Sequence, residues 1–194
     1  IDQYVGSEVE VKMFQATNWT LSMESSSEGA DYVSSSLTPN SDGNNSSSNF
    51  NNKEVKITYL RKFQFDHGKQ LMSVVVRSSE DKKVHVFCKG SFEKIGLMCK
   101  KGKNILPHNY SDVSQSYALS GGYVLGIAHY VLPESFDMSK ISTMTRDDFE
   151  IQGSFELLGL LVFRNEPKPE SNEAITRLRK GAIRPVMITG DNAQ

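Results

Sequence analysis

Two Val-rich runs separated by five polar residues restrict the fold more than any other feature of the chain. Residues 71–77 and 83–88 are both β-type, and the segment between them is Ser-Ser-Glu-Asp-Lys. A polar connection of this length between two such runs predicts a β-hairpin. Because the strands of a hairpin run in opposite directions, we expect antiparallel pairing in the sheet.

Three other stretches have strand patterns. Residues 55–65 place apolar side chains on odd positions, and this period of two is typical of a half-buried strand. Residues 123–132 and 155–163 are the other two strand candidates.

Apolar residues at helical spacing mark three segments among these strands. Residues 8–17 and 92–99 each carry apolar side chains on one helical face. Residues 112–120 form a third predicted helix, with Ser111 as its N-cap and Gly121 just past its end. Strands in hairpin-like succession with helices inserted predict an α+β domain, a twisted antiparallel sheet flanked by helices.

The pattern changes at the stretch Arg-Asn-Glu-Pro-Lys-Pro-Glu. Pro167 and Pro169 interrupt regular pairing and stiffen the backbone. Beyond them, residues 171–180 have a helical pattern that ends at Gly181, and residues 183–189 form a buried-type strand. Strand, helix and strand make the parallel crossover unit, so a second, α/β-type domain should begin here. The predicted boundaries are 1–163 for the first domain, 164–169 for a hinge and 170–194 for the start of the second.

Residues 22–52 are a compositionally separate segment. They contain eleven Ser, six Asn, four acidic residues and no Lys or Arg. Such a segment buries too little apolar surface to offset the entropy lost on ordering its backbone. We therefore predict that it is a disordered insertion within the first domain.

Charge and composition exclude several classes of partner. With 22 basic and 23 acidic residues, the formal net charge is -1, so no global field would attract nucleic acid. No apolar run reaches the ~18 residues of a membrane-spanning helix, so we expect the fragment not to insert into a membrane. The two cysteines and four histidines show no metal-ligand spacing, and we predict no metal site in this chain.

Motifs of complete enzymes are absent from the sequence. It contains neither type of Gly-rich phosphate-binding loop, no Gly-x-Ser-x-Gly elbow, no His-Glu-x-x-His and no Asp-Lys-Thr-Gly nucleophile. We therefore predict that the chain holds no catalytic residue. A complete soluble phosphatase is disfavoured for the same reason.

Two positions have side chains suited to binding a nucleotide. Lys89, followed by Gly90, ends a predicted strand, where its ammonium could reach a phosphate. Phe65 ends another strand and could offer a ring face to a purine, a contact worth roughly 1–3 kcal/mol per base. Taken singly, Lys89 fits a solvated turn better and Phe65 a core or rim aromatic, so these residues alone leave the choice open.

Five stretches, taken in order, resemble the cytosolic nucleotide-binding domain of P-type ATPases, specifically type V, the branch that includes lysosomal polyamine transporters. They are "GSEVEVKMFQATNW", "RKFQFDHGKQLMSVVV", "CKGSFE", "LLGLLVFRNEPKPES" and "GAIRPVMITGDN". The last two resemble the hinge and the Thr-Gly-Asp-Asn turn of the haloacid-dehalogenase-like phosphorylation domain. Five motifs in a fixed order make the resemblance specific.

The resemblance implies roles at the adenine end of a nucleotide site. Phe65 would stack on adenine, and Glu10 would accept a hydrogen bond from its amino edge. Lys89 and Gly90 would line the pocket, and Gln70 stands where many relatives carry a lysine near the phosphates.

At the other end of the site, the resemblance implies contacts with the ribose and phosphates. Asn165 and Lys168 match the hinge pair, which would meet the nucleotide when the domains close. Thr189, Gly190 and Asp191 match the phosphorylation-domain turn, where the threonine contacts the transferred phosphoryl group and the aspartate helps hold the Mg-nucleotide.

The resemblance also implies the setting in which the chain works. The cofactors would be ATP and, in the whole parent protein, Mg²⁺, and the partners would be its phosphorylation and actuator domains. The aspartyl nucleophile would lie upstream of Ile1, with the rest of the phosphorylation domain downstream of Gln194. The chain would be a cytosolic part of a multi-pass membrane protein of a lysosome- or vacuole-like endomembrane.

Some residues depart from the family pattern and suggest an alternative function. Tyr123 stands in place of an arginine, Ser91-Phe92 in place of Ala-Pro, and Gln70 in place of a lysine. These changes favour a nucleotide-incompetent regulatory or interaction domain on the same scaffold as the competing hypothesis.

Overall fold

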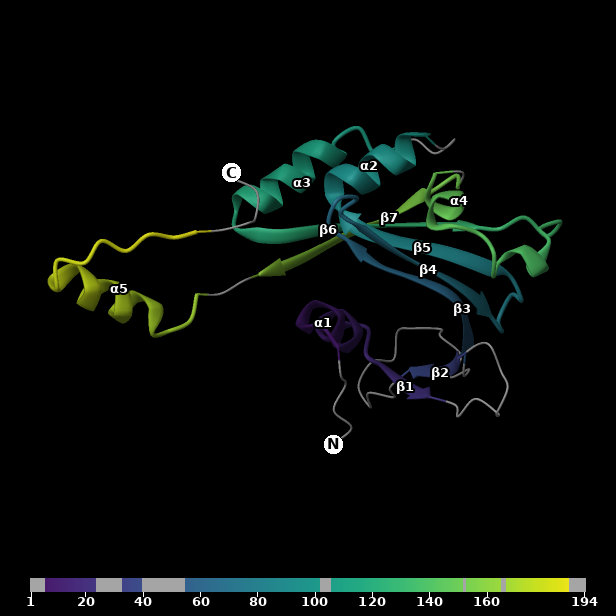
Figure 1. Ribbon diagram of the computed structural model, residues 1–194, viewed down its shortest axis with the longest axis horizontal. Helices are drawn as coiled ribbons and strands as arrows, with labels where there is room; N and C mark the ends of the chain where they lie inside the picture. The colour runs from purple at the N-terminus through teal and green to yellow at the C-terminus, as the bar shows by residue number, and fades with distance from the viewer. Residues whose placement is uncertain are drawn as a thin grey trace, which may run out of the picture.

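The computed structural model describes residues 6–23, 33–39, 55–101, 106–151, 153–164 and 167–188. Within these ranges seven strands form one sheet, in the order β1-β2-β3-β4-β5-β6-β7, and all neighbours pair antiparallel (Figure 1). The strands are β1 (Trp19–Met23), β2 (Val33–Pro39), β3 (Val55–Asp66), β4 (Leu71–Ser78), β5 (Val84–Ser91), β6 (Gly122–Val131) and β7 (Glu156–Arg164). The helices are α1 (Glu8–Ala16), α2 (Phe92–Lys101), α3 (Tyr110–Leu119), α4 (Arg146–Glu150) and α5 (Ser171–Lys180), with a 3-10 turn η1 at Met138–Lys140.

The predicted α+β architecture, a twisted antiparallel sheet flanked by helices, is confirmed. The hairpin expected from its polar connection is present as β4 and β5, in which Val75 pairs with Val86. Alternate residues of both strands are buried, because one side of the sheet packs against helices.

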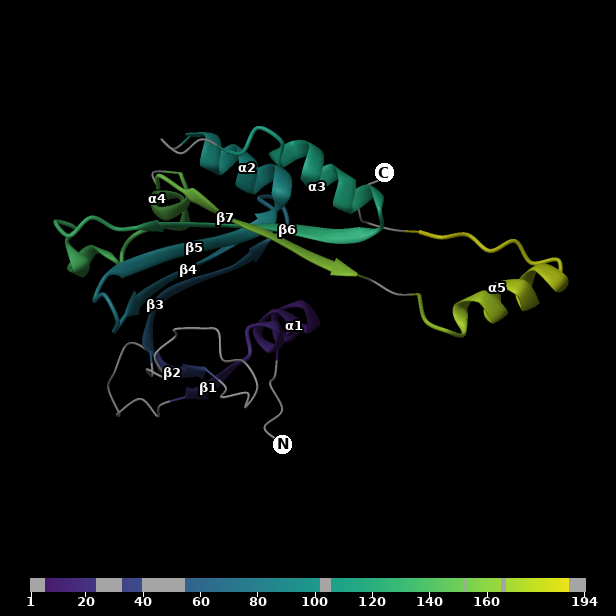
Figure 2. The same cartoon turned by 180° about the vertical axis from the view of Figure 1, so that it is seen from behind.

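The sheet has two faces that carry different elements. Helices α2, α3 and α4 cover one face, and α1 lies across the other (Figures 1 and 2). We call these the helical face and the α1 face. The paired row Ser73, Cys88 and Ala128 points to the helical face. The adjacent row Met72, Lys89 and Ile127 points to the α1 face, because successive strand residues alternate sides.

The main hydrophobic core lies between the sheet and the helical face. Val75 and Val86 from the strands, Ile95 from α2 and Phe149 from α4 are fully buried in one cluster. Burying an apolar side chain of this size contributes about 1.5–3 kcal/mol. This packing holds α2 and α4 against the sheet.

Strand β3 contains two irregularities that bend it. The pairing with β4 shifts between Tyr59 and Arg61, and again between Phe63 and Asp66. At the second shift two residues of β3, Gln64 and Phe65, stand opposite one residue of β4. This is a β-bulge, a feature that re-aims side chains and often lies next to functional sites.

The prediction that residues 22–52 are disordered is wrong over Val33–Pro39. That segment forms β2, which pairs with β1 on one side and β3 on the other. Its order comes from backbone ladders rather than from apolar side chains, and Ser35 and Ser36 are buried. Amino-acid composition alone does not predict a strand of this kind, because its order depends on hydrogen bonds to neighbouring strands. Residues 24–32 and 40–52 lie outside the described residues.

The predicted N-cap of α3 is also wrong. The helix begins at Tyr110, and its N-cap is Asn109 without a side-chain hydrogen bond, so Ser111 lies inside the helix. Tyr110 is buried, and its hydroxyl donates to the carbonyl of Phe92 at 2.7 Å. This tertiary contact draws Tyr110 into the first turn.

The segment after α5 differs from its prediction as well. The helix ends at Gly181 as expected, but residues 183–188 form no strand. Ile183, Val186, Met187 and Ile188 are 56–93% exposed. A buried-type strand needs neighbours on both sides, and no described strand pairs with this segment. Thr189 lies outside the described residues.

Candidate functional site

Glu10 and Lys89 meet on the α1 face although 79 positions separate them in the sequence. The Nζ of Lys89 lies 3.4 Å from Oε1 of Glu10 and 3.6 Å from Sδ of Met13. The Lys89 side chain is 18% exposed. The Glu10 side chain is 41% exposed, so the pair is only partly shielded from water and contributes modestly to holding α1 on the sheet.

The start of α1 determines where Glu10 points. Ser7 is the N-cap, and its Oγ accepts a hydrogen bond from the backbone N–H of Glu10 at 3.3 Å. This places Glu10 in the first turn, where the helix dipole favours a carboxylate. Glu10 and Met13 are three positions apart and therefore share one helical face. That spacing is the sequence signal by which Met13 could have been assigned to the site.

A cavity of about 260 Å³ lies between α1 and the sheet beside this ion pair. Its lining residues are Met13, Met72, Ser73, Val74, Phe87, Cys88, Lys89 and Ile127. The only ionisable ammonium in that lining is Lys89. The lining is therefore mostly apolar with one cationic group, a composition suited to a largely apolar ligand that carries an acceptor.

Asp66 pairs with the core residue Leu71 and lies 3.9 Å from Arg146 of α4, so it points to the helical face; because successive strand residues alternate sides, the preceding Phe65 points to the α1 face, as Lys89 does. Phe65 stands in the β3 bulge opposite Met72, and Met72 pairs directly with Lys89. The Phe65 side chain is 46% exposed, and its ring meets His67 edge-on at a centroid distance of 5.1 Å. Phe65 is not among the residues that line the 260 Å³ cavity. The ring is thus largely open to solvent, and the Phe65 backbone stands opposite Met72, which does line the cavity.

Gly90 and Gln70 contact one another through the backbone. The N–H of Ser91 donates to the carbonyl of Gln70 at 3.1 Å, and Ser91 Oγ lies 3.4 Å from Gln70 Oε1. A Cβ on Gly90 would lie 2.2 Å from that same carbonyl oxygen. Gly90 is therefore needed for the close approach of β5 to the β3–β4 turn. The nucleotide roles assigned to Gly90 and Gln70 stay predictions.

The predicted hinge residue Lys168 does not join the other described site residues. It is exposed, and its carbonyl accepts from the N–H of Ser171 at the start of α5. The helix lies beyond the end of β7, away from the sheet (Figure 2). The other predicted contacts of this end, Asn165, Thr189, Gly190 and Asp191, lie outside the described residues.

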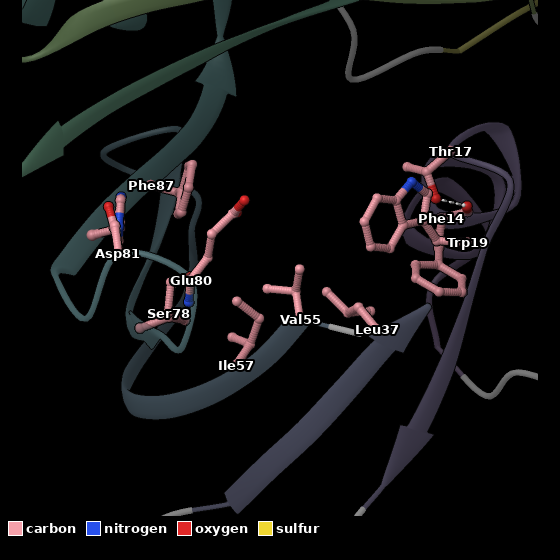
Figure 3. Close-up of a pocket in the computed structure, with 12 residues that line it drawn as sticks. Phe14, Thr17, Trp19, Leu37, Val55, Ile57, Ser78, Glu80, Asp81 and Phe87 are labelled. Atoms are coloured by element: carbon pink, nitrogen blue, oxygen red, sulfur yellow. Dashed lines mark hydrogen bonds and ion pairs between the residues drawn. The ribbon is translucent and has the colours of Figure 1, made fainter. Parts of the chain in front are cut away.

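A larger cavity, about 730 Å³, is lined by residues of α1, of strands β1 to β5 and of the β4–β5 turn. In Figure 3, Phe14 and Trp19 lie on one side and Phe87 on the other, with Val55 and Ile57 between them. Most of the lining is aromatic or aliphatic, and its acidic members are Glu80 and Asp81.

A histidine pair that the sequence had left unassigned borders the larger cavity. His85 Nδ1 lies 2.9 Å from His129 Nε2, and His85 Nε2 lies 3.1 Å from Oδ1 of Asp81. The hydrogen bond from His85 lowers the pKa of Asp81 below its ordinary value. Burial, followed by the nearby His85, lowers the pKa of His129. His129 also stacks on Phe87, with ring centroids 4.7 Å apart.

The described residues contain neither a candidate metal centre nor a membrane-spanning helix. No group of three or more His, Cys, Asp or Glu side chains there could hold a metal ion. Among the same residues, no helix has the length and apolar character needed to cross a bilayer.

Comparison with known proteins identifies the family. Residues 36–170 match the family described as P-type ATPase, cytoplasmic domain N. The chain is 32% identical to human "Polyamine-transporting ATPase 13A2" over 196 residues, covering 100% of this chain and 16% of that protein. It is 31% identical to mouse "Probable cation-transporting ATPase 13A5" over 97% of this chain and 15% of that protein.

A third relative gives the same result. The chain is 30% identical to "Polyamine-transporting ATPase 13A3" of Macaca fascicularis over 96% of its own length, again 16% of the relative. The chain thus spans about a sixth of the length of these proteins. The seven-stranded antiparallel sheet, the order of the sequence motifs and the family match over residues 36–170 agree, and the chain belongs to the cytoplasmic N domains of P-type ATPases.

Proposed function

We propose that this chain binds an adenine nucleotide on the α1 face and presents it for phosphoryl transfer to an aspartate outside the chain. The observation that carries the proposal is the meeting of Glu10 and Lys89, from α1 and β5, on the sheet face that also carries Phe65. An aromatic ring, a carboxylate and an ammonium are the three groups that a purine with an amino edge would use.

Each group would contribute a different interaction. The ring of Phe65 would stack on the base, and the carboxylate of Glu10 would accept a hydrogen bond from the exocyclic amino group. The ammonium of Lys89 would add positive charge beside the apolar cavity. Phosphoryl transfer depends on positioning and charge neutralisation more than on covalent chemistry, so a domain that only holds the nucleotide suits this reaction.

In the whole parent protein, we propose that ATP is used with Mg²⁺ and that the phosphorylation and actuator domains are the partners of this domain. Hinge closure would bring Asn165, Lys168, Thr189, Gly190 and Asp191 to the phosphates. The names of the relatives favour cation or polyamine transport as the activity that ATP would drive. An endomembrane location, of the lysosomal or vacuolar kind, is part of the same proposal.

Titration of this chain with ATP tests the proposal. We expect a dissociation constant near the millimolar range, equivalent to about -4 kcal/mol, because one stacked base and a few hydrogen bonds act without the neighbouring domain. NMR chemical shifts of Phe65, Glu10 and Lys89 should move on addition of ATP. A folded chain without shift changes at these residues would contradict nucleotide binding.

A pair of matched variants tests the stacking assignment. Phe65→Ala should weaken ATP binding by roughly tenfold or more, since base stacking on an aromatic ring is worth about 1–3 kcal/mol. Tyr59→Ala removes another exposed aromatic side chain of β3, outside the bulge, and should leave the affinity unchanged. Equal affinities for wild type and Phe65→Ala would show that the ring does not stack on the base.

One observation favours the alternative, a nucleotide-incompetent regulatory or interaction domain. Tyr123, in the place of a family arginine, is exposed beside Phe163, with ring centroids 6.2 Å apart. An aromatic pair there offers an apolar surface and no cation for a phosphate. The ATP titration separates the two functions directly, since the alternative requires that saturating ATP leaves the spectrum unchanged.

A further inference from the structure

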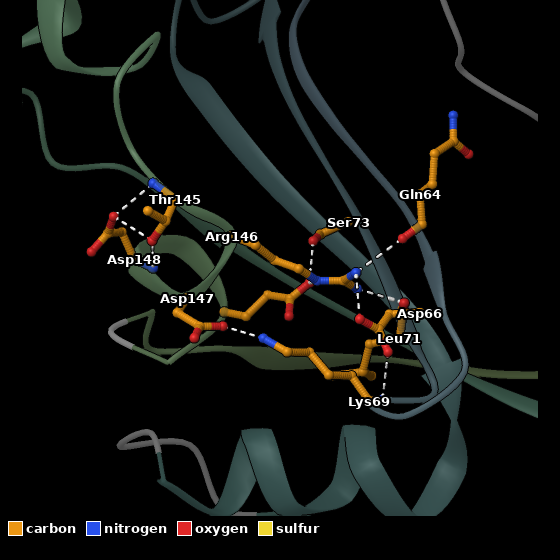
Figure 4. A network of polar contacts seen from close by, with 10 residues as sticks. Gln64, Asp66, Lys69, Leu71, Ser73, Thr145, Arg146, Asp147 and Asp148 are labelled. Atoms are coloured by element: carbon orange, nitrogen blue, oxygen red, sulfur yellow. Dashed lines mark hydrogen bonds and ion pairs between the residues drawn. The ribbon is translucent and has the colours of Figure 1, made fainter.

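Arg146, on the helical face, contacts three separate segments of the chain. Its Nε donates to Oε1 of Glu150 at 2.7 Å within α4. Its Nη1 donates to the carbonyl of Gln64 in β3 at 3.0 Å, and its Nη2 donates to the carbonyl of Leu71 in β4 at 2.5 Å. Figure 4 shows the guanidinium between α4 and the end of the β3–β4 hairpin.

This contact is shielded from solvent and its charges are paired. The Arg146 side chain is 16% exposed and that of Glu150 is 4% exposed. Ser73, which is buried, donates its hydroxyl to the same Oε1 of Glu150 at 2.5 Å. The carboxylate and guanidinium therefore neutralise one another in a poorly hydrated place, where charge-assisted hydrogen bonds are strong.

The geometry requires arginine in particular. The three acceptors lie in different directions around one side chain, and the planar guanidinium presents donors in a rigid fork that can reach all of them. A lysine ammonium is a single point of charge on a flexible stem. The substitution Arg146→Lys would keep a charge next to Glu150, but the ammonium could not hold both carbonyls at once.

Of the two carbonyls that Arg146 binds, that of Gln64 lies within the bulge that carries Phe65 and that of Leu71 lies beside it. Gln64 immediately precedes Phe65, and its carbonyl belongs to the same planar peptide unit as the N–H of Phe65. Leu71 pairs with Asp66, directly after Phe65. A bulge disrupts the regular ladder between its strands, so contacts from outside the pair have more influence on its backbone.

A second contact joins the same two elements. Lys69, in the turn that follows β3, forms an ion pair with Asp147 of α4. Within the turn, Asp66 Oδ1 accepts from the N–H of Lys69 at 2.9 Å, and this hydrogen bond is the main reason why the pKa of Asp66 is lowered. Helix α4 thus contacts both the strands of the hairpin and the turn between them.

We propose that Arg146 is a positioning residue for the nucleotide site: it holds the β3 bulge from the helical face and thereby sets the direction in which Phe65 projects from the α1 face. The part of this inference that concerns affinity rests on the proposed function, and the part that concerns Phe65 does not. Arg146 itself is separated from the nucleotide by the sheet, so it acts only through the backbone of Gln64 and Phe65.

The test compares Arg146→Lys with Arg61→Lys in this chain. Arg61 is a matched control because it too lies on the sheet and donates to backbone carbonyls about 80 positions away, those of Ile141 at 3.1 Å and Ser142. These hydrogen bonds do not involve Gln64 or Phe65, and the Arg61 guanidinium lies 5.2 Å from the ring centroid of Phe63, the last paired residue before the bulge. Each variant is examined by NMR without nucleotide, for the ring and amide signals of Phe65, and is then titrated with ATP.

We expect Arg146→Lys to shift and broaden the Phe65 signals and to weaken ATP binding by about fivefold or more, because a mobile ring stacks less well. Arg61→Lys should change neither quantity, even where it lowers stability to a similar extent. If Arg146→Lys leaves the Phe65 signals as in wild type, or if Arg61→Lys changes them equally, the proposal is overturned.

Two further experimental outcomes separate a failure of the proposed function from a failure of the positioning role. If the wild type binds no ATP, the proposed function fails, while the Phe65 signals of Arg146→Lys still decide whether the arginine positions the ring. If Arg146→Lys does not fold, the double variant Arg146→Gln/Glu150→Gln replaces it, because removing both charges leaves no unpaired ion in the core. Wild-type Phe65 signals in that folded double variant would overturn the proposal.

Discussion

At the scale of single residues, the strictest steric requirement near the candidate site is at Gly90. Its position leaves no room for a Cβ, which would lie 2.2 Å from the carbonyl oxygen of Gln70 and 2.6 Å from a methyl group of Leu71. The sequence resemblance assigns Gly90 to a nucleotide pocket, and the structure adds a packing reason for the glycine. A residue can thus match a binding motif because the scaffold requires it.

Replacing Gly90 should therefore destabilise the chain whether or not nucleotide is present. Gly90→Ala places its methyl group against backbone atoms, and overpacking of this kind typically costs about 1–3 kcal/mol. Urea unfolding followed by circular dichroism measures the change. The control is Gly6→Ala, where the new Cβ has ordinary contacts and should have little effect. A fully stable Gly90→Ala variant would mean that β5 and the β3–β4 turn are farther apart than described.

His129 should make the stability of the chain depend on pH. Its pKa is lowered in the folded state by burial and then by His85, so below about pH 6.5 the unfolded state binds more protons than the folded state. The free energy of unfolding should therefore fall as the pH falls from about 7.5 to about 5.5. Urea titrations at both pH values should show a smaller decrease for His129→Gln than for wild type. His108→Gln, which alters an exposed histidine, should retain the full decrease.

At the scale of elements, the short helix α4 shows how a few residues can control a distant site. It has only five residues, yet it carries Arg146, Asp147, Phe149 and Glu150, which contact the β3–β4 hairpin or the core. Helices this short are unstable alone and depend on tertiary packing and caps. A sequence pattern of apolar residues at helical spacing needs a longer segment to be recognised, and α4 was not predicted.

A capping box stabilises the first turn of α4, and removing it should measurably lower the free energy of unfolding. The Thr145 side chain accepts from the N–H of Asp148, and the Asp148 carboxylate accepts from the N–H of Thr145 at 2.7 Å. Thr145→Ala should lower the free energy of unfolding by about 1 kcal/mol, the usual effect of losing such a cap. Thr176→Ala changes an exposed threonine within α5 and should not lower it. Equal stabilities of the two variants would indicate that packing alone holds α4.

At the scale of the whole molecule, the one-sided core determines which groups water can reach. Both cysteines are free and buried under the helical face. Burial raises the pKa of Cys88 to about 12 and that of Cys99 to about 11. The folded chain therefore keeps both thiols protonated at a pH at which an unfolded chain would ionise them.

The difference in cysteine pKa between the folded and the unfolded chain can be tested by two measurements. A thiolate-specific reagent at about pH 8.5 should modify the cysteines only in the unfolded chain, because the thiolate is the reactive form. The free energy of unfolding should also fall as the pH rises above about 9, since the folded state then binds more protons than the unfolded state. The variant Cys88→Ala/Cys99→Ala should show a shallower fall than wild type. Rapid modification of the native chain would contradict the burial of these thiols.

Several features of this protein follow from its sequence alone. The polar segment between residues 71–77 and 83–88 is too short for any connection but a hairpin. The period of two in residues 55–65 indicates a strand with one solvent-exposed face. These sequence patterns depend only on residues close together in the chain, so they can be recognised without knowledge of the fold. The order of the motifs was also sufficient to identify the family, which the match over residues 36–170 confirmed.

Other features were decided only by the tertiary structure. The order of β2 depends on backbone ladders to β1 and β3, and residues 183–188 remain without a strand because no described strand pairs with them. The ion pair of Glu10 with Lys89 and the hold of Arg146 on the Phe65 bulge join groups about 80 positions apart. Their physical basis is the same: a sequence pattern records what each residue prefers among its neighbours along the chain, whereas such contacts arise only when the sheet has brought distant segments together.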